Sequence, residues 1–171
     1  MTAVIAPATS DHIAAIAELA REIWYEYYVP LIGRAQVDYM VPRFQSVDAI
    51  KRQLSEGYEY YQVLDSAGSL VGYFAVRQDL RTAQDPAGKL FLSKFYLHRS
   101  VRGTGTGRLC MEFIEDLARR RRLAVLWLTV NKGNPAVRVY EKLGFRIAEP
   151  IVMDIGGGFV MDDYRMEKPL T

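Results

Sequence analysis

The sequence has few cysteines and histidines and lacks any long apolar run. Its single cysteine, Cys110, excludes an intramolecular disulfide, and its two histidines leave too few ligands for a Cys/His zinc site. The longest apolar stretch, Leu123 to Val130, is far shorter than the ~20 residues that cross a bilayer. No basic cluster followed by an apolar segment opens the chain. We therefore expect a soluble, cytoplasmic protein that holds no metal.

The chain also lacks a strong excess of charge. It has 22 Lys and Arg against 20 Asp and Glu, a formal net charge of +2, which does not indicate a nucleic-acid binder. The basic run from Arg119 to Arg122 ends an expected helix, where cations suit the helix dipole. What is present is an ordinary globular composition, 50% hydrophobic and 25% charged over 171 residues. We expect one domain over residues 1–171, a monomer or homodimer with no nucleic-acid or membrane partner.

Hydrophobic periodicity and turn residues predict the order β-α-α-β-β-β-α-β-α-β-β. The first helical stretch is expected to begin with N-cap oxygens from Thr9 to Asp11 and to stop at Pro30. The second is expected to break at Pro42 and to resume at Ser46. The expected strands are 4–8, 58–64, 69–77, 89–97, 123–130, 145–155 and 159–168. The later helices are 106–121 and one from Pro135 to Gly144.

The strand order predicts a mixed sheet. Strand 123–130 is fully apolar, which is typical of a strand covered on both faces. Strands 89–97 and 123–130 with the helix between them form one right-handed parallel crossover. The fold class is therefore α/β (α+β), with about seven mostly antiparallel strands, a central parallel βαβ unit and flanking helices.

A glycine-rich turn joins strand 89–97 to the next helix. Its sequence is Arg102-Gly103-Thr104-Gly105-Thr106-Gly107-Arg108. Glycines let the backbone approach a bulky anion, and the amides at a helix start face outward, so the turn suits a phosphate or pyrophosphate. Arg108 stands where a Walker loop needs lysine and where a dinucleotide fingerprint needs its third glycine. Taken alone, the turn also suits a connector without a ligand.

The pattern Arg/Gln-x-x-Gly-x-Gly/Ala resembles the acyl-CoA pyrophosphate loop of the GCN5-related N-acetyltransferase (GNAT) family. A second resemblance lies in the strand end Leu128-Thr129-Val130-Asn131, followed by Asn134-Pro135-Ala136 and then by Tyr140-Glu141-Lys142-Leu143-Gly144-Phe145. The element order matches the family from end to end. The segments 91–97, 128–132 and 154–168 are similar to a bacterial branch in which some members acetylate spermidine and spermine.

The resemblance implies a set of cofactor and catalytic residues. Tyr140 is implied as the general acid for the CoA sulfur, although a packing tyrosine is the alternative. The spacing from Asn134 to Tyr140 is one residue shorter than is usual in the family, so the role of Asn134 is inferred less directly. The implied acetyl-CoA contacts are Phe95, Tyr96 and Leu97 along the pantetheine arm, Arg102, Gly103, Thr104, Gly105, Thr106, Gly107 and Arg108 at the pyrophosphate, and Asn131, Asn134 and Lys142. The alternative for the three cations, Arg102, Arg108 and Lys142, is that they are solvated and do not contact the cofactor.

An acceptor amine needs aromatic and acidic neighbours. Trp24, Glu26 and Tyr28, with Tyr27 beside them, supply both, although core packing also explains the aromatic residues. Asp162 and Asp163 form a second acidic pair, and Asp162 shares the strand face of Val160 and Tyr164. We expect Trp24, Glu26, Tyr28 and Asp162 to bind the acceptor, or Asp162 to be a charge at a turn.

The resulting hypothesis is direct acetyl transfer from acetyl-CoA to a primary amine in a ternary complex, a small amine or polyamine first. The alternatives are a protein N-terminal or lysine acetyltransferase and a non-catalytic acyl-CoA-binding regulatory module. No general base is evident in the sequence. Lys94 would repel a cationic substrate inside a cleft, so we expect it to face solvent.

Overall fold

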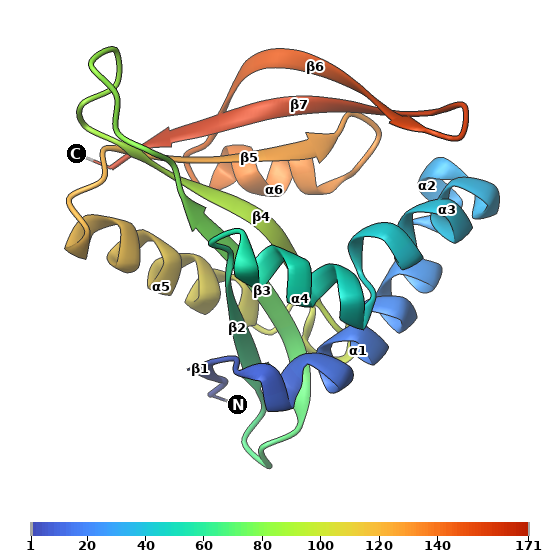
Figure 1. Cartoon of the computed structure of the whole chain (residues 1–171). Helices are drawn as coiled ribbons and strands as arrows, with labels where there is room; N and C mark the ends of the chain where they lie inside the picture. The colour runs from blue at the N-terminus through green and yellow to red at the C-terminus, as the bar shows by residue number, and fades with distance from the viewer. Residues whose placement is uncertain (1, 171) are drawn as a thin grey trace. The chain divides into compact units, whose positions relative to one another are not determined.

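The computed structural model describes residues 2–170 and divides into two compact units. The first unit holds the residues up to Arg77 together with Lys94–Ile114. The second holds Gln78–Ser93 together with the residues from Glu115 onward. Strand β4 (Lys89–Leu97) and helix α5 (Thr106–Arg120) each pass from one unit to the other (Figure 1).

The first unit begins with β1 (Val4–Pro7) and a 3-10 turn, Ser10–His12. Helices α1 (Ile13–Tyr27), α2 (Val29–Ile32), α3 (Arg34–Phe44) and α4 (Val47–Ser55) follow. Strands β2 (Glu59–Leu64) and β3 (Leu70–Gln78) form the expected hairpin, with β1 antiparallel to β2. The turn between them is held by Asp65, whose Oδ1 accepts hydrogen bonds from the amides of Ala67 and Ser69.

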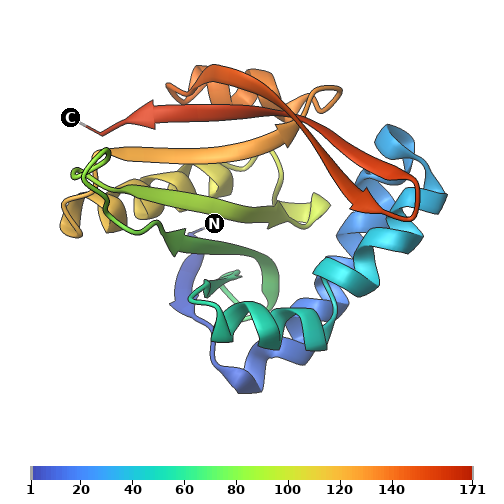
Figure 2. The same ribbon diagram turned by 45° about the horizontal axis from the view of Figure 1, so that its top comes forward.

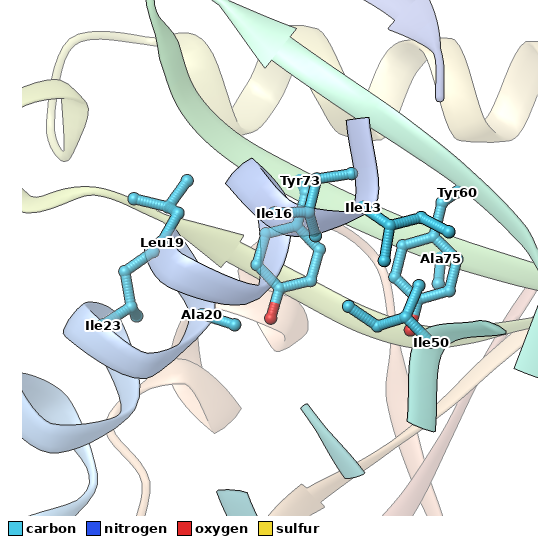
Figure 3. Packing of buried hydrophobic residues seen from close by; sticks show 9 residues of the cluster. All are labelled: Ile13, Ile16, Leu19, Ala20, Ile23, Ile50, Tyr60, Tyr73 and Ala75. Atoms are coloured by element: carbon cyan, nitrogen blue, oxygen red, sulfur yellow. The ribbon is translucent and has the colours of Figure 1, made fainter. Parts of the chain in front are cut away.

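A hydrophobic cluster holds α1 against this hairpin (Figure 3). Its helical members recur at spacings of three and four, which places them on one face of α1 and opposite Tyr60, Tyr73 and Ala75 of the strands. Burial of each large side chain contributes roughly 1.5–3 kcal/mol. On the opposite face of the hairpin, Phe113 of α5 packs against Tyr61 and Phe74. The members from α1 are Ile13, Ile16, Leu19, Ala20 and Ile23.

The second unit contains β5 (Val125–Asn131), α6 (Ala136–Lys142), β6 (Arg146–Gly156) and β7 (Phe159–Pro169). The first residues of β4 pair parallel with β5, as the sequence predicts, and Phe91 stacks on Trp127 at a ring distance of 4.0 Å. Strand β7 is antiparallel to both β5 and β6, and the β6–β7 hairpin continues beyond the end of β5 (Figure 2). In order of hydrogen bonding, the sheet is β1-β2-β3-β4-β5-β7-β6, which confirms the mixed seven-stranded sheet.

Two local expectations about proline are wrong. Helix α1 ends at Tyr27, before Pro30, so Pro30 does not define its end. At the other end, Thr9 is the N-cap of the 3-10 turn that leads directly into α1, and it forms a capping box with His12. Pro42 lies inside α3 and does not break it. Pro42 removes one intrahelical hydrogen bond, and the burial of Val37, Met40 and Val41 on α3 offsets this loss. By contrast, Ser46 caps α4 as expected, accepting from the amide of Ala49 at 3.1 Å.

Strand β5 is not covered on both faces as the apolar run suggested, because buried and half-buried residues alternate along it. Over residues 2–170, no helix is long and apolar enough to cross a membrane.

Candidate functional site

The turn before α5 presents a run of free backbone amides. In the described chain, the amides of residues 103–108 have no backbone partner, and the first intrahelical bond there is from Leu109 to the Gly105 carbonyl at 3.1 Å. Gly103 and Gly105 have φ values of +75° and +90°, which favour glycine, and a Cβ on either would meet nothing within 4 Å. The turn therefore offers unpaired donors beside open space, an arrangement suited to a phosphate group.

The side chain of Arg102 holds this turn against α1. Its Nη1 and Nη2 donate to the two carboxylate oxygens of Glu26 at 2.9 and 3.1 Å, and its Nε donates to the carbonyl of Leu97 at 3.0 Å. The guanidinium also lies over the ring of Tyr27, 5.1 Å from its centroid. Arg102 thus ties the end of β4 and helix α1 together, and it neutralises the carboxylate that the sequence offered for the acceptor.

His98 makes a second tie to α1. Its Nδ1 accepts from the amide of Ser100 at 3.2 Å, so the proton stands on Nε2, which donates to Glu22 at 3.0 Å. Together these groups line a pocket of about 240 Å³ between α1 and the segment after β4. Its lining residues are Glu22, Ile23, Glu26, His98, Arg99 and Arg102.

The last residues of β4 are packed closely against β3. A Cβ on Gly72 would lie 2.5 Å from Leu97 Cδ2 and 2.9 Å from the Tyr96 carbonyl, so only glycine permits this approach. On the side of α1, Tyr96 contacts the rings of Trp24 and Tyr28 at 5.8 and 6.0 Å. The structure therefore brings the predicted pantetheine strand and two predicted acceptor residues together within the first unit.

Trp24 carries an unsatisfied donor in this aromatic group. Its ring stacks on Tyr28 at 4.3 Å and is 4% exposed, yet its Nε1 has no hydrogen-bond partner. A buried N–H without a partner costs about 1–3 kcal/mol. Core packing explains the ring but leaves the orphaned N–H without a structural reason.

The expectation that Lys94 faces solvent is wrong. The residue is 6% exposed, and its Nζ donates to the carbonyl of Phe44 and to Tyr60 Oη at 2.7 Å. Burial, reinforced by the charge of Arg52, lowers the pKa of Lys94 to about 7. The two hydrogen bonds use both hydrogens of a neutral amine, which suits the uncharged form.

The second unit contains Tyr140 and the polar residues around it. Tyr140 lies on α6, with its ring 5.6 Å from Phe145 in an edge-on contact. Asn134 is buried, and its Oδ1 accepts from the amide of Ala136 at 2.9 Å, so this oxygen supports the start of α6. Asn131 Oδ1 likewise accepts from the amide of Gly133, and Lys142 is exposed at the end of α6.

The two neighbouring aspartates on β7 have opposite environments. Asp162 is exposed and pairs with Lys132 at 2.7 Å. Asp163, which the sequence interpretation passed over, is 4% exposed and lies opposite Asn131 in the register of β5 and β7. Burial, and then the charge of Asp162, raises the pKa of Asp163 to about 6, against a lowering effect of Lys132. Only the register of β7 distinguishes the two positions.

The fold and the glycine turn are those of an acyltransferase: a mixed sheet whose parallel pair is joined through a glycine-rich turn with unpaired amides. The sequence profile of the acetyltransferase (GNAT) family matches residues 14–145. The chain belongs to this family. A search of curated proteins finds no match.

Solved structures share the fold. PaiA N-acetyltransferase from Thermoplasma acidophilum, in complex with coenzyme A, has a TM-score of 0.77 at 18% identity and covers 99% of each chain. A GCN5-related N-acetyltransferase from Rhodopseudomonas palustris has a TM-score of 0.79 at 17% identity, covering 99% of this chain and 97% of its own. The protein yncA from Salmonella typhimurium, solved with its cofactor acetyl-CoA, has a TM-score of 0.67 at 21% identity, covering 100% and 95%.

Proposed function

We propose that this GNAT-family protein transfers acetyl from acetyl-CoA to a small primary amine, a polyamine first, by direct attack in a ternary complex. The observation that carries the proposal is the run of unpartnered amides at residues 103–108, beside glycines whose missing side chains leave open space. Two structural neighbours were solved with coenzyme A or acetyl-CoA. A cytoplasmic location and a monomeric or homodimeric state stay predictions from the sequence.

The turn fits the pyrophosphate of coenzyme A. Its amides supply several donors, and the dipole at the start of α5 favours negative charge there. Arg108, whose exposed side chain pairs with Glu112 at 3.3 Å, adds a cation beside the turn. Arg102, in contrast, acts through its pair with Glu26, which holds the turn in place before the cofactor binds. Phe95 to Leu97 would hold the pantetheine arm, and acetyl-CoA supplies the activated acetyl group.

Tyr140 is assigned to the departing sulfur. An ordinary tyrosine, with a pKa near ~10, is a weaker acid than a thiol near ~8.5, so complete proton transfer to the thiolate is uphill by roughly 2 kcal/mol. A hydrogen bond from the Tyr140 hydroxyl to the developing charge on sulfur therefore suffices for part of this role. Asn131 and Lys142 are assigned to the cofactor on the family resemblance alone.

The aromatic group of the first unit is assigned to the acceptor. Tyr28 and Tyr96, both half-buried, offer ring faces that attract an alkylammonium, and the buried ring of Trp24 packs against both. Glu26 is excluded as a free counter-ion because Arg102 occupies both of its carboxylate oxygens.

Thiol release from acetyl-CoA with a panel of amines tests the proposal. The panel contains spermidine, ethanolamine, a free amino acid, and peptides with a free N-terminus or a lysine. Turnover with a small amine supports the proposal. Turnover with peptides alone indicates a protein acetyltransferase instead. Tight coenzyme A binding without turnover of any amine indicates a regulatory acyl-CoA-binding module.

A further inference from the structure

The first part of the glycine turn receives little support from packing. A Cβ on Gly103 or Gly105 would meet nothing within 4 Å in the described chain. The Thr104 hydroxyl donates to the carbonyl of Val101 at 2.6 Å, which ties the turn back to the segment before it. That segment, residues 98–102, consists largely of a single 3-10 turn. The direction in which the free amides point therefore depends on the contacts that hold residues 98–102.

Both ring nitrogens of His98 make such contacts. The Nδ1 atom accepts from the Ser100 amide at 3.2 Å and lies 2.7 Å from the Ser100 hydroxyl. Because the amide is the donor, Nδ1 carries no proton, and Nε2–H donates to a carboxylate oxygen of Glu22 at 3.0 Å. The main-chain amide of His98 donates to the carbonyl of Val71 on β3 at 2.8 Å. His98 therefore connects β3, α1 and the segment that leads into the turn, all within the first unit.

Two carboxylates on α1 hold the two ends of this segment. Glu22 and Glu26 are one helical turn apart, so they lie on the same side of α1. Glu22 binds His98 at the start of the segment. Glu26 binds Arg102 at its end through both carboxylate oxygens, and all four residues line the pocket of about 240 Å³. One contact alone would let the segment pivot about Arg102, whereas two contacts four residues apart also fix its direction.

Capping of the 3-10 turn does not account for the imidazole of His98. A cap needs only an acceptor for the Ser100 amide, which an asparagine or aspartate side chain also supplies. The Nε2–H group and its bond to Glu22 are not required for this cap. Among the described residues, Glu22 has no side-chain partner other than His98. The contact between His98 and α1 is therefore a separate feature that needs its own explanation.

We propose that His98 is a positioning residue for acetyl-CoA and acts through its Nε2–H bond to Glu22. The inference rests on the proposed function, in which the amides of residues 103–108 bind the pyrophosphate. The bond fixes the direction of the turn before the cofactor arrives, which lowers the ordering cost of binding. It acts on binding and not on the chemical step, so its loss should raise the KM for acetyl-CoA and leave kcat unchanged.

Two substitutions of His98 separate the roles of its ring nitrogens. His98→Asn keeps an acceptor near the place of Nδ1 for the Ser100 amide but is too short to reach Glu22. His98→Gln has an NH₂ group near the place of Nε2 that can donate to Glu22, but it lacks the acceptor at Nδ1. With an amine that the wild type turns over, His98→Asn should raise the KM for acetyl-CoA by about 3–10-fold at unchanged kcat. His98→Gln should stay within about twofold of wild type. A KM for His98→Gln that equals or exceeds that of His98→Asn overturns the proposal.

Substitutions on α1 test the same bond from its other side. Glu22→Ala should raise the KM for acetyl-CoA as much as His98→Asn does, and the double variant should show no larger effect. Glu18→Ala is the matched control, since Glu18 is an exposed carboxylate one turn earlier on α1, and it should leave this KM unchanged. Additive effects of Glu22→Ala and His98→Asn would show that the two side chains act separately and would overturn the proposal.

Calorimetry with coenzyme A, which needs no turnover, distinguishes this inference from the proposed function. The Kd of coenzyme A should rise about 3–10-fold in His98→Asn and stay near the wild-type value in His98→Gln. Equal Kd values for the two variants overturn the positioning role even if acetyl transfer occurs. The expected order of Kd values without turnover of any amine supports the positioning role and rejects the acetyl-transfer assignment. A wild-type protein that does not bind coenzyme A rejects both.

Discussion

The replacement of Lys94 by methionine should stabilise the protein and remove a pH dependence. Lys94 is buried in the first unit with a carbonyl and a phenol as partners and without a carboxylate, and its pKa is about 7. In the unfolded chain the pKa returns to ~10.4. Holding the amine uncharged near neutral pH therefore costs the folded state about 4 kcal/mol.

The sign of the pH dependence follows from which state, folded or unfolded, binds more protons. Between pH 7 and 10 the unfolded chain carries the extra proton, so stability rises with pH at a slope approaching about 1.4 kcal/mol per unit. From pH 7.0 to 8.5 the wild type should gain between about 1 and 2 kcal/mol from this group. Above that range Cys110, whose pKa burial raises to about 12, ionises in the unfolded chain alone and adds the opposite slope.

Urea unfolding at pH 7.0 and 8.5 measures the effect. Lys94→Met removes the cost of about 4 kcal/mol but leaves the carbonyl of Phe44 without its donor, which costs about 1 kcal/mol. The variant should therefore be more stable than wild type by about 2–3 kcal/mol at pH 7. The advantage should shrink toward pH 8.5. Lys51→Met, at an exposed position of α4, is the matched control and should change neither value. Parallel pH curves for wild type and Lys94→Met would show that Lys94 stays charged in the fold and would refute the reasoning.

Three further predictions concern the cofactor turn and the general acid. Tyr140→Phe should leave coenzyme A binding intact in calorimetry and lower kcat by about 10²–10³-fold; unchanged turnover from pH 6 to 9 would remove Tyr140 from the mechanism. Gly105→Val should raise the KM for acetyl-CoA at least about tenfold, because its Cβ would enter the phosphate space. Gly68→Val is the control, since Gly68 also has a left-handed φ, +82°, with nothing within 4 Å, but lies in the β2–β3 turn. Arg102→Gln and Glu26→Gln should each raise the KM for acetyl-CoA by roughly 5–10-fold, because each breaks the same bidentate pair, worth about 1–2 kcal/mol. The double variant should have no higher KM than either single variant, and additive effects would contradict a shared role.

Local signals in the sequence were sufficient for most of the fold. The alternation of residues and the Asp65–Gly68 turn predicted the β2–β3 hairpin, and the glycine turn marked the start of α5. Pro42 misled because the proline rule counts only the lost hydrogen bond, whereas tertiary packing of Val37, Met40 and Val41 keeps α3 helical.

The chemistry of the site was less predictable because its partners are distant in sequence. Arg102 and Glu26 are 76 residues apart, and Lys94 meets the Phe44 carbonyl 50 residues away. The sequence around Glu26 suggests a free carboxylate, and only the fold shows that Arg102 binds both of its oxygens. Alternation on β7 separates Asp162 from Asp163 but does not say which face is buried, since that depends on pairing with β5 and on the irregular register with β6.

Among residues 2–170, Lys94 and Asp163 depart from the rule that buried charges are paired. Each is at least nine-tenths buried, and neither has an oppositely charged group within hydrogen-bond distance. An apolar residue at either position would cost less free energy, so packing does not account for them. In both cases burial moves the pKa toward neutrality, to about 7 and about 6, which is the range a proton-transfer group needs. The stability cost at Lys94 is therefore a measurement of the desolvation of an unpaired charge.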